Sequence, residues 1–334
     1  MPGLYQWLLA TWYGATRRGA WLLPLAWLFA LLAWLRRGLY RRGLLSAYRS
    51  TRPVVIVGNV TVGGTGKTPL VIWLTERLTG DGRRVGVASR GHGRRDTAAR
   101  RVCAGDAVAD VGDEPLLIAR RTGAAVAVGA DRAAAVRLLE GDCDLILCDD
   151  GLQHYALERD AEVAVVDGAR GLGNGWLLPA GPLRESPSRL AAADAIVVNG
   201  AGFGMTGSLR MDIEPTRFVG VASGEGRDLA DFRGQRAHAV AAIGNPGRFF
   251  GMLGRLGIDV DAHPLPDHAT PGERQLRFAD GAAVLMTEKD AVKCPDGGLH
   301  HAWYVEVDAH IEDAAAAALI ERIVRLARER NLGA

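Results

Sequence analysis

A glycine-rich run at residues 58–68 contains the residue types that bind phosphate. It follows the apolar run 54–57, typical of a strand, and precedes a helix-like run at 70–74. In this layout, loop N–H groups surround phosphate oxygens, a lysine adds a point charge at the outer phosphates and a threonine hydroxyl ligates magnesium. A plain strand-to-helix turn is the alternative. The pattern predicts a phosphate loop that binds nucleotide through Thr61, Val62, Gly63, Gly64, Thr65, Gly66, Lys67 and Thr68.

The lysine of this loop is of a residue type that is rare in the chain. Lysine occurs only at positions 67, 289 and 293, whereas the other 37 of the 40 basic residues are arginine. With such a bias we expect lysine mainly where a compact ammonium is needed. Lys67 fits this expectation, and chance retention stays open for Lys293.

The apolar run 145–148 ends in two carboxylates, Asp149 and Asp150. A carboxylate at the carboxyl end of a buried strand lies near the crevice where α/β sheets bind ligands. In a phosphate-loop protein such acids hold magnesium. We therefore predict Asp149, Asp150 and Thr68 as metal ligands, with ordinary turn chemistry as the alternative for the acids. Gln153 and His154 are expected to face the same cleft.

Two acids, Asp113 and Glu114, come just before a helix expected at 116–121, with Pro115 near its start. Acids at this position usually cap the helix. The functional alternative is a carboxylate that accepts the proton of an attacking hydroxyl. The residues alone leave both interpretations open.

Three further segments have polar groups that fit a structural role as well as a chemical one. The proline-bracketed loop 178–185 presents Arg184 beside Glu185. This arginine either braces phosphate charge or forms a surface ion pair. His268 lies on an expected loop, where a histidine is most often solvated. Residues 287–290 close an expected strand and are typical of a capping turn.

The N-terminal 52 residues differ from the rest of the chain. They contain no acidic residue, and their arginines and tryptophans are Arg17, Arg18, Arg36, Arg37, Arg41, Arg42, Arg49, Arg52, Trp7, Trp12, Trp21, Trp27 and Trp34. The uncharged run 20–35 is shorter than the roughly 20 residues of a spanning helix, and Pro24 interrupts it. Tryptophan and arginine favour the headgroup region of anionic membranes. We expect a helix in the membrane interface; a helix buried against the main domain is the alternative, and a signal peptide does not fit.

Length and composition predict an ordered protein of two domains. The chain has 334 residues, 48% of them hydrophobic and 23% charged, as in globular proteins. The four cysteines have no metal-binding spacing, and Cys143 and Cys148 are expected to be buried thiols in a reducing, cytosolic setting.

Alternating strand and helix patterns predict an α/β fold of the P-loop NTPase type, with a parallel sheet covered by helices on both faces. We divide the chain into an N-terminal membrane-associated helical segment (1–50), a P-loop domain (51–222), a smaller α/β domain (223–312) and a C-terminal helix (313–334). The expected strands are 54–57, 84–88, 125–128, 145–148, 163–166, 195–198, 238–242, 283–286 and 303–307. Residues 209–222 resemble a connector, and the last helix is expected at 314–330.

Together these segments resemble the tetraacyldisaccharide 4′-kinases, the lipid A 4′-kinase family. The resemblance covers nearly the whole chain, in ordered blocks at 58–59, 63–69, 89–91, 112–115, 149–154, 178–185, 243–246, 267–268 and 286–290. The general phosphate-loop pattern has a glycine where this chain has Thr61, with Gly63 and Gly64 supplying the flexibility; the family shares this departure. The family often has a second histidine where this chain has Ala269.

The resemblance implies transfer of the γ-phosphate of ATP, with Mg²⁺, to the 4′-hydroxyl of a membrane-bound lipid A disaccharide. It also implies work at the cytoplasmic face of the bacterial inner membrane, beside an anionic membrane surface and with no nucleic-acid partner. The catalytic residues it implies are Asp113 as base, His268 of the second domain as its partner, Lys67 and Arg184. The two domains must close for Asp113 and His268 to meet.

A membrane-associated ATPase switch is the main alternative function. Loops of that class carry an additional lysine five residues before the main one, and this chain has Val62 there. A lipid-binding scaffold with a relict nucleotide site is the second alternative, and the intact Lys67 and Thr68 oppose it.

Overall fold

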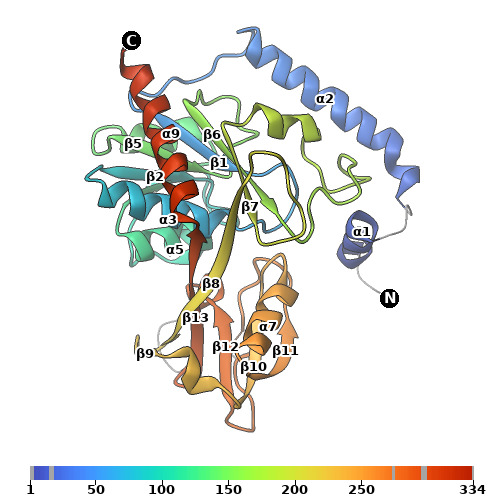
Figure 1. The fold of residues 1–334 in the computed structure, drawn as a ribbon, viewed down its shortest axis with the longest axis vertical. Helices are drawn as coiled ribbons and strands as arrows, with labels where there is room; N and C mark the ends of the chain where they lie inside the picture. Colours follow the sequence, from blue (N-terminus) through green and yellow to red (C-terminus); the bar gives the residue numbers. More distant parts are fainter. Residues whose placement is uncertain (1–3, 15–18, 273–274, 295–298, 333–334) are drawn as a thin grey trace.

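The computed structural model describes residues 4–14, 19–272, 275–294 and 299–332. The described strands form one 13-stranded sheet with the order β11-β10-β12-β13-β8-β7-β6-β1-β5-β2-β4-β3, and β9 pairs with β8. Figure 1 shows two units along the long axis, joined by the long strands β8 and β13.

The larger unit is built on parallel strands that are almost entirely apolar. Its parallel strands are β1 (Val54–Gly58), β2 (Val85–Ser89), β4 (Ala125–Val128), β5 (Leu145–Asp149), β6 (Ala161–Asp167) and β7 (Ala195–Asn199). A short antiparallel strand that was not predicted, β3 (Arg100–Val102), forms the edge. Continuous apolar runs are typical of parallel strands covered on both faces. The predicted parallel sheet is confirmed.

Helices cover both faces of this part of the sheet. Its helices are α3 (Lys67–Gly80), α4 (Val108–Val111), α5 (Asp113–Thr122), α6 (Arg132–Leu139) and α9 (Asp313–Leu332). The strand residues that alternate to one face form a core with α3, α5 and α9, and those of the other face form a core with α6. Cys143 and Cys148 are buried free thiols, as predicted.

The second unit corrects the predicted connector at 209–222. Residues Leu209–Gly220 form β8, which pairs antiparallel with β13 (Ala302–Ile311) and parallel with β7. The other elements are β9 (Gly226–Arg227), β10 (Arg236–Ala241), α7 (Pro246–Arg255), β11 (Asp259–Pro264), β12 (Ala283–Thr287) and α8 (Glu288–Ala291). Strand β11 was not predicted. The domain boundary at residue 222 stays a prediction, because β8 pairs with strands of both units.

The N-terminal segment forms α1 (Leu4–Tyr13) and α2 (Leu23–Arg41), with a 3₁₀ turn at Ala20–Leu22 between them. Pro24 occupies the first turn of α2, where a proline is tolerated. The expected interruption of the helix at Pro24 is therefore wrong. The helical stretch Ala20–Arg41 is 22 residues long, and only 11% of its most apolar window is buried. By length and composition alone it can cross a membrane.

Apolar side chains along the helical stretch Ala20–Arg41 remain in contact with solvent. The exposed ones are Trp21, Leu25, Trp27, Leu28, Leu31, Leu32, Trp34 and Leu35. The alternative of a helix buried against the main domain is therefore wrong. Figure 1 shows α2 along the outer edge of the larger unit. The predicted flanking charges Arg17 and Arg18 lie outside the described residues.

Candidate active site

The phosphate loop leaves β1 and ends at the start of α3, as the strand–loop–helix layout predicts. Gly63 and Gly66 have φ angles of 107° and 92°, which glycine adopts without steric cost. Thr61 instead pairs with Leu183 in an isolated antiparallel bridge, flanked by backbone hydrogen bonds of 2.7 and 2.8 Å. This extended backbone needs no glycine, which explains the threonine at the position where the general pattern has one.

Side chains from distant segments hold the loop in place. Asn199 at the end of β7 donates from Nδ2 to the carbonyl of Thr65 at 3.0 Å, and accepts from Arg248 of α7 at 2.6 Å. The hydroxyl of Tyr13 in α1 donates to the carbonyl of Val62 at 3.3 Å. The N-terminal segment therefore contacts the phosphate loop directly, and Arg248 of the second unit supports it through Asn199.

Asp150 lies between two cations at the carboxyl end of β5. Its Oδ1 is 3.5 Å from Lys67 Nζ, and its Oδ2 is 3.1 Å from Arg184 Nη1. Burial alone would raise the pKa of Asp150, but the positive charges of Lys67 and Arg184 outweigh it and lower the pKa to about 2. Asp150 is therefore ionised and holds both cations beside the phosphate loop.

The neighbouring carboxylate, Asp149, has no such partner. Its side chain is buried, and neither carboxylate oxygen has a hydrogen-bond partner among the described residues. Burial, together with the negative charge of Glu114, raises the pKa of Asp149. A buried carboxylate without a partner is costly, and oxygen donors of this type suit Mg²⁺. Asp149 therefore fits a cation site beside Thr68, which lies in the first turn of α3.

Asp113 and His268 meet across the two units. Asp113 begins α5 and is only 4% exposed, whereas His268 follows β11 on the second unit. His268 Nδ1 lies 3.1 Å from Asp113 Oδ2. The N-cap of α5 is Gly112, without a side-chain cap, but Asp113 Oδ1 accepts the backbone N–H of Glu114 at 2.9 Å in the first turn, so Asp113 supports the helix start and also faces His268. The structure brings together the pair that the family resemblance implied.

Two lysines complete the surroundings of Asp113. Lys289 Nζ and Lys293 Nζ lie 3.8 and 3.6 Å from Asp113 Oδ2. Burial alone would raise the pKa of Asp113, but the hydrogen bond from His268 and the lysine charges lower it well below its usual range. The same hydrogen bond raises the pKa of His268 against the effect of burial. Asp113 is therefore a fixed negative charge, and His268 is the more basic partner.

Glu114 connects this pair to the acids of β5. Lys289 Nζ is 3.0 Å from Glu114 Oε1, and the charge of Glu114 contributes to the raised pKa of Asp149. Lys67 pairs with Asp150 at one end and Lys289 pairs with Glu114 and Asp113 at the other, while the like charges of Glu114 and Asp149 repel each other between them. The dyad and the phosphate loop thus belong to one electrostatic network.

A cavity of about 530 Å³ opens beside the dyad. His92 follows the predicted block 89–91, and its ring centroid lies 4.6 Å from that of His268. The polar residues that line the cavity are His92, Asp106, Asp113, Arg120, His268, Thr270 and Lys293. It can admit an acceptor group to the exposed edge of the His268 ring.

The second unit also approaches the phosphate loop through its backbone. A Cβ atom at Gly244 would lie 2.8 Å from the backbone nitrogen of Gly64. Arg170 donates from both terminal guanidinium nitrogens to the carbonyl of Gly244 at 3.2 Å. Glycine at position 244 therefore allows the 243–246 segment to close over the loop.

Several residues of this network were not singled out from the sequence. The scarcity of lysine indicated Lys67, but it also applied to Lys289 and Lys293, which both face Asp113. No local sequence pattern marks His92, Arg170 and Asn199 as site residues, because their partners are distant in the chain.

Other predictions near the site are resolved individually. Arg184 pairs with Asp150, while Glu185 accepts from Tyr155 at 2.6 Å, so the expected Arg184–Glu185 surface pair is wrong. Gln153 and His154 were expected to face the cleft of the β5 acids. Gln153 Oε1 lies 3.5 Å from Arg184 Nη1, the partner of Asp150.

His154 lies 3.9 Å from Asp131 at the start of α6. The capping turn at 287–290 forms, with the Thr287 side chain accepting from the Asp290 backbone.

The β1–loop–α3 unit, with acids at the end of the neighbouring strand, defines the class of P-loop nucleotide-binding proteins. The family model of the tetraacyldisaccharide-1-P 4′-kinases matches residues 18–325. The chain belongs to the tetraacyldisaccharide 4′-kinase family.

Curated relatives match the chain along most of its length. It is 47% identical over 325 residues to a tetraacyldisaccharide 4′-kinase of Methylobacillus flagellatus, covering 96% of this chain and 97% of the relative. The corresponding enzyme of Pseudomonas aeruginosa is 48% identical over 306 residues, with coverage of 90% and 92%. A crystal structure of LpxK from Aquifex aeolicus in complex with ATP superposes with a TM-score of 0.78, at 27% identity, covering 92% of this chain and 99% of that one.

We predict that Gly244→Ala lowers turnover by up to about 100-fold, the cost of a displacement of roughly 1 Å in an active site. The new Cβ would collide with the backbone of Gly64 and push the 243–246 segment away from the phosphate loop. Steady-state kinetics would show the loss while the thermal midpoint stays near the wild type. Gly254→Ala is the matched control, because no atom lies within 4 Å of its Cβ position. Equal activity of both variants would contradict the close approach.

Proposed function

We propose that this chain transfers the γ-phosphoryl group of ATP to the 4′-hydroxyl of a tetraacylated glucosamine disaccharide 1-phosphate, a lipid A precursor. The family is that of ATP-dependent tetraacyldisaccharide 4′-kinases of lipid A biosynthesis. The observation that supports the residue assignment is the 3.1 Å pair of Asp113 and His268, which lines a cavity of about 530 Å³. The ATPase switch is not favoured, because the family match spans nearly the whole chain.

ATP binds at the phosphate loop in this proposal. Loop amides from Thr61 to Thr68 surround the β- and γ-phosphates, and Lys67 provides the point charge. The Aquifex relative was crystallised with ATP, and its fold covers 92% of this chain. The backbone of Arg184 bonds to Val60 at the start of the loop, its guanidinium pairs with Asp150, and in this proposal it braces the charge of the transferring group.

The described donors also suit magnesium. Thr68, Asp149 and Asp150 would hold it, and the two partnerless oxygens of Asp149 favour that residue as the direct ligand. Bound Mg²⁺ would neutralise charge on the β- and γ-phosphates. Asp150 orients Lys67 and Arg184, because it pairs with both.

The proton of the acceptor hydroxyl passes to His268 in this proposal. Nδ1 of His268 is engaged by Asp113, which leaves Nε2 to accept. As the hydroxyl oxygen bonds to the γ-phosphorus, the bond from that phosphorus to the β–γ bridging oxygen breaks and ADP leaves. Asp113 stabilises the imidazolium that forms, as a buried carboxylate does in other carboxylate–histidine pairs. This refines the sequence-based assignment of Asp113 as the base, because its lowered pKa makes it a poor acceptor.

The membrane part of the proposal depends on α2 and its contacts. The acceptor is anchored in a bilayer by its acyl chains, so the enzyme must work at the membrane surface. Helix α2 exposes apolar side chains that include Trp27 and Trp34, and Trp21 is exposed in the 3₁₀ turn before it. Arginines at the carboxyl end of α2 suit anionic headgroups. We place the chain at the cytoplasmic face of the inner membrane, where ATP is available.

The direct test is incubation with γ-labelled ATP and a tetraacyldisaccharide 1-phosphate. We expect one labelled phosphate per disaccharide, at the 4′ position by mass spectrometry. Lys67→Ala should lower kcat by about 100- to 1,000-fold, the range for removal of one preorganised charge-stabilising donor. Arg77→Ala, at the other end of α3, is the control and should keep wild-type turnover. ATP hydrolysis without label in the lipid would contradict the proposed function.

The dyad predicts a specific pH dependence. Only neutral His268 accepts a proton, and its pKa is raised above the ordinary histidine value of 6.5, so kcat should fall as the pH decreases through a value above 6.5. Asp113→Asn should move this acid limb to lower pH, since it removes the main cause of the raised pKa, and lower kcat by about 100- to 10,000-fold.

His268→Gln is the control, because glutamine does not titrate. Any acid limb that remains in the pH profile of its kcat reports the titration of another group, such as the nucleotide. The other titratable or charged groups that act on the ring are His92, Lys289 and Asp267. If kcat of the wild-type protein instead falls only well below pH 6, in the range where carboxylates titrate, Asp113 itself is the base.

The exposed face of α2 gives the membrane prediction. Trp27, Leu31 and Trp34 are 67%, 56% and 66% exposed, so changing all three to alanine should not disturb the fold. Each apolar side chain that enters a bilayer contributes about 1.5–3 kcal/mol, and we expect cosedimentation with anionic vesicles to weaken by at least about 100-fold. Leu138→Ala, an exposed leucine on α6, is the control. Unchanged sedimentation of the triple variant would place the membrane contact elsewhere.

A further inference from the structure

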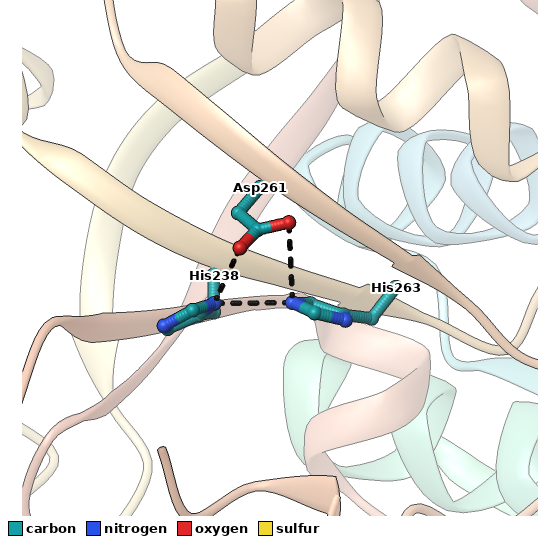
Figure 2. Close-up of side chains that lie close together, drawn as sticks. All are labelled: His238, Asp261 and His263. Atoms are coloured by element: carbon teal, nitrogen blue, oxygen red, sulfur yellow. Dashed lines mark hydrogen bonds and ion pairs between the residues drawn. The ribbon is translucent and has the colours of Figure 1, made fainter. Parts of the chain in front are cut away.

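A cluster of two histidines and an aspartate lies on the second unit, outside the proposed active site. His238 is on β10, while Asp261 and His263 are on the adjacent parallel strand β11 (Figure 2). His238 is directly opposite Asp261 in the strand register, and His263 is two residues further along β11. Because alternate strand residues share one face, the three side chains converge on one point above the sheet.

The spacing of the three ligand atoms matches a metal coordination shell. His238 Nδ1 is 3.0 Å from His263 Nε2 and 3.4 Å from Asp261 Oδ2, and His263 Nε2 is 3.7 Å from Asp261 Oδ1. A tetrahedral zinc site with bonds of about 2.0–2.2 Å places its ligand atoms roughly 3.3 Å apart. Figure 2 shows these atoms turned toward one another.

A fourth residue orients the more buried histidine. Both oxygens of Asp280 lie 3.1 Å from His238 Nε2, so this nitrogen donates its proton to the carboxylate. The lone pair of Nδ1 then faces Asp261 and His263. Metal-ligating histidines usually make such a bond to a carboxylate with the second ring nitrogen. Phe278 stacks on the His238 ring at 3.6 Å and fixes its plane.

We propose that His238, Asp261 and His263 form a binding site for a divalent transition metal, with zinc as the best fit. Two imidazoles and one carboxylate are borderline ligands that suit zinc better than magnesium. Asp261 and His263 are half-exposed, so water can occupy the fourth position. Arg236 lies 3.5 Å from Asp261 Oδ2 and can stay as an outer contact while the other oxygen binds the metal.

The site would join the two strands that lead to the catalytic histidine. Strand β10 continues to Ala242, whose carbonyl accepts the backbone N–H of His268 at 3.1 Å. The chain leaves β11 at Pro264 and reaches His268 five residues after His263. A metal between the strands would therefore stabilise the edge of the second unit and the loop that holds His268, without contacting substrate.

The test is cobalt(II) titration of the full-length protein, without a histidine tag and without nucleotide. We expect visible absorption bands with the intensity of tetrahedral cobalt(II), and we expect them to saturate at one equivalent of cobalt. Added zinc should displace the cobalt and abolish the bands. His263→Asn and Asp261→Asn should lose these bands, and both residues are exposed enough for the variants to fold. Asp280→Asn should weaken zinc binding by about 10- to 100-fold, as other outer-ligand changes do.

Two variants separate this site from other metal donors in the chain. His310→Asn changes an exposed strand histidine on β13, and Asp149→Asn removes the proposed magnesium ligand; both should keep the cobalt bands. Bands that persist in His263→Asn, or a wild-type protein without bands, would overturn the proposal. In the latter case a proton shared between His238 and His263 accounts for their 3.0 Å separation.

Discussion

The charge of one buried carboxylate is the constraint on which the arrangement of the two units depends. Asp113 is almost fully enclosed, and a buried charge without partners is strongly destabilising. Among the described residues, its own unit provides the backbone N–H of Glu114, whereas the imidazole of His268 and the ammonium groups of Lys289 and Lys293 all come from the second unit. Docking of the second unit therefore neutralises Asp113 and assembles the dyad in the same step. A site built in this way is complete only when the units are closed, which also excludes water from the reacting groups.

The three lysines of the chain show how the charges are distributed. Lys67 lies at the phosphate loop, and Lys289 and Lys293 surround Asp113, while arginine occupies every other basic position. A lysine ammonium is a compact point charge that fits beside a buried carboxylate, whereas a guanidinium needs a planar partner. Lys293 is enclosed between Asp290, Asp113 and a backbone carbonyl, a position that suits a compact ammonium.

The parts of the fold that were predicted correctly are those with a local signal. Buried parallel strands are continuous apolar runs, and the phosphate loop is a contiguous motif. Strand β8 contains Pro215 and many polar residues and was mistaken for a connector, while β11 lies at the sheet edge, where Asp259 and Asp261 are tolerated. The dyad followed only from the family resemblance, because its residues are 155 positions apart in the chain and helix capping explains Asp113 equally well at the sequence level. Lys289 and Lys293 were missed for the same reason.

The N-terminal segment links membrane contact to the nucleotide site through a short chain of contacts. Trp12 of α1 donates to the carbonyl of Pro179 at 3.0 Å, and Tyr13 contacts Val62 of the phosphate loop. The 178–185 loop that receives Trp12 also pairs with Thr61 and presents Arg184. Helix α2 leaves this packed region with its apolar face uncovered. A bilayer that covers this face would therefore lie next to the segments that support the phosphate loop, which is where an acceptor confined to the membrane must be presented.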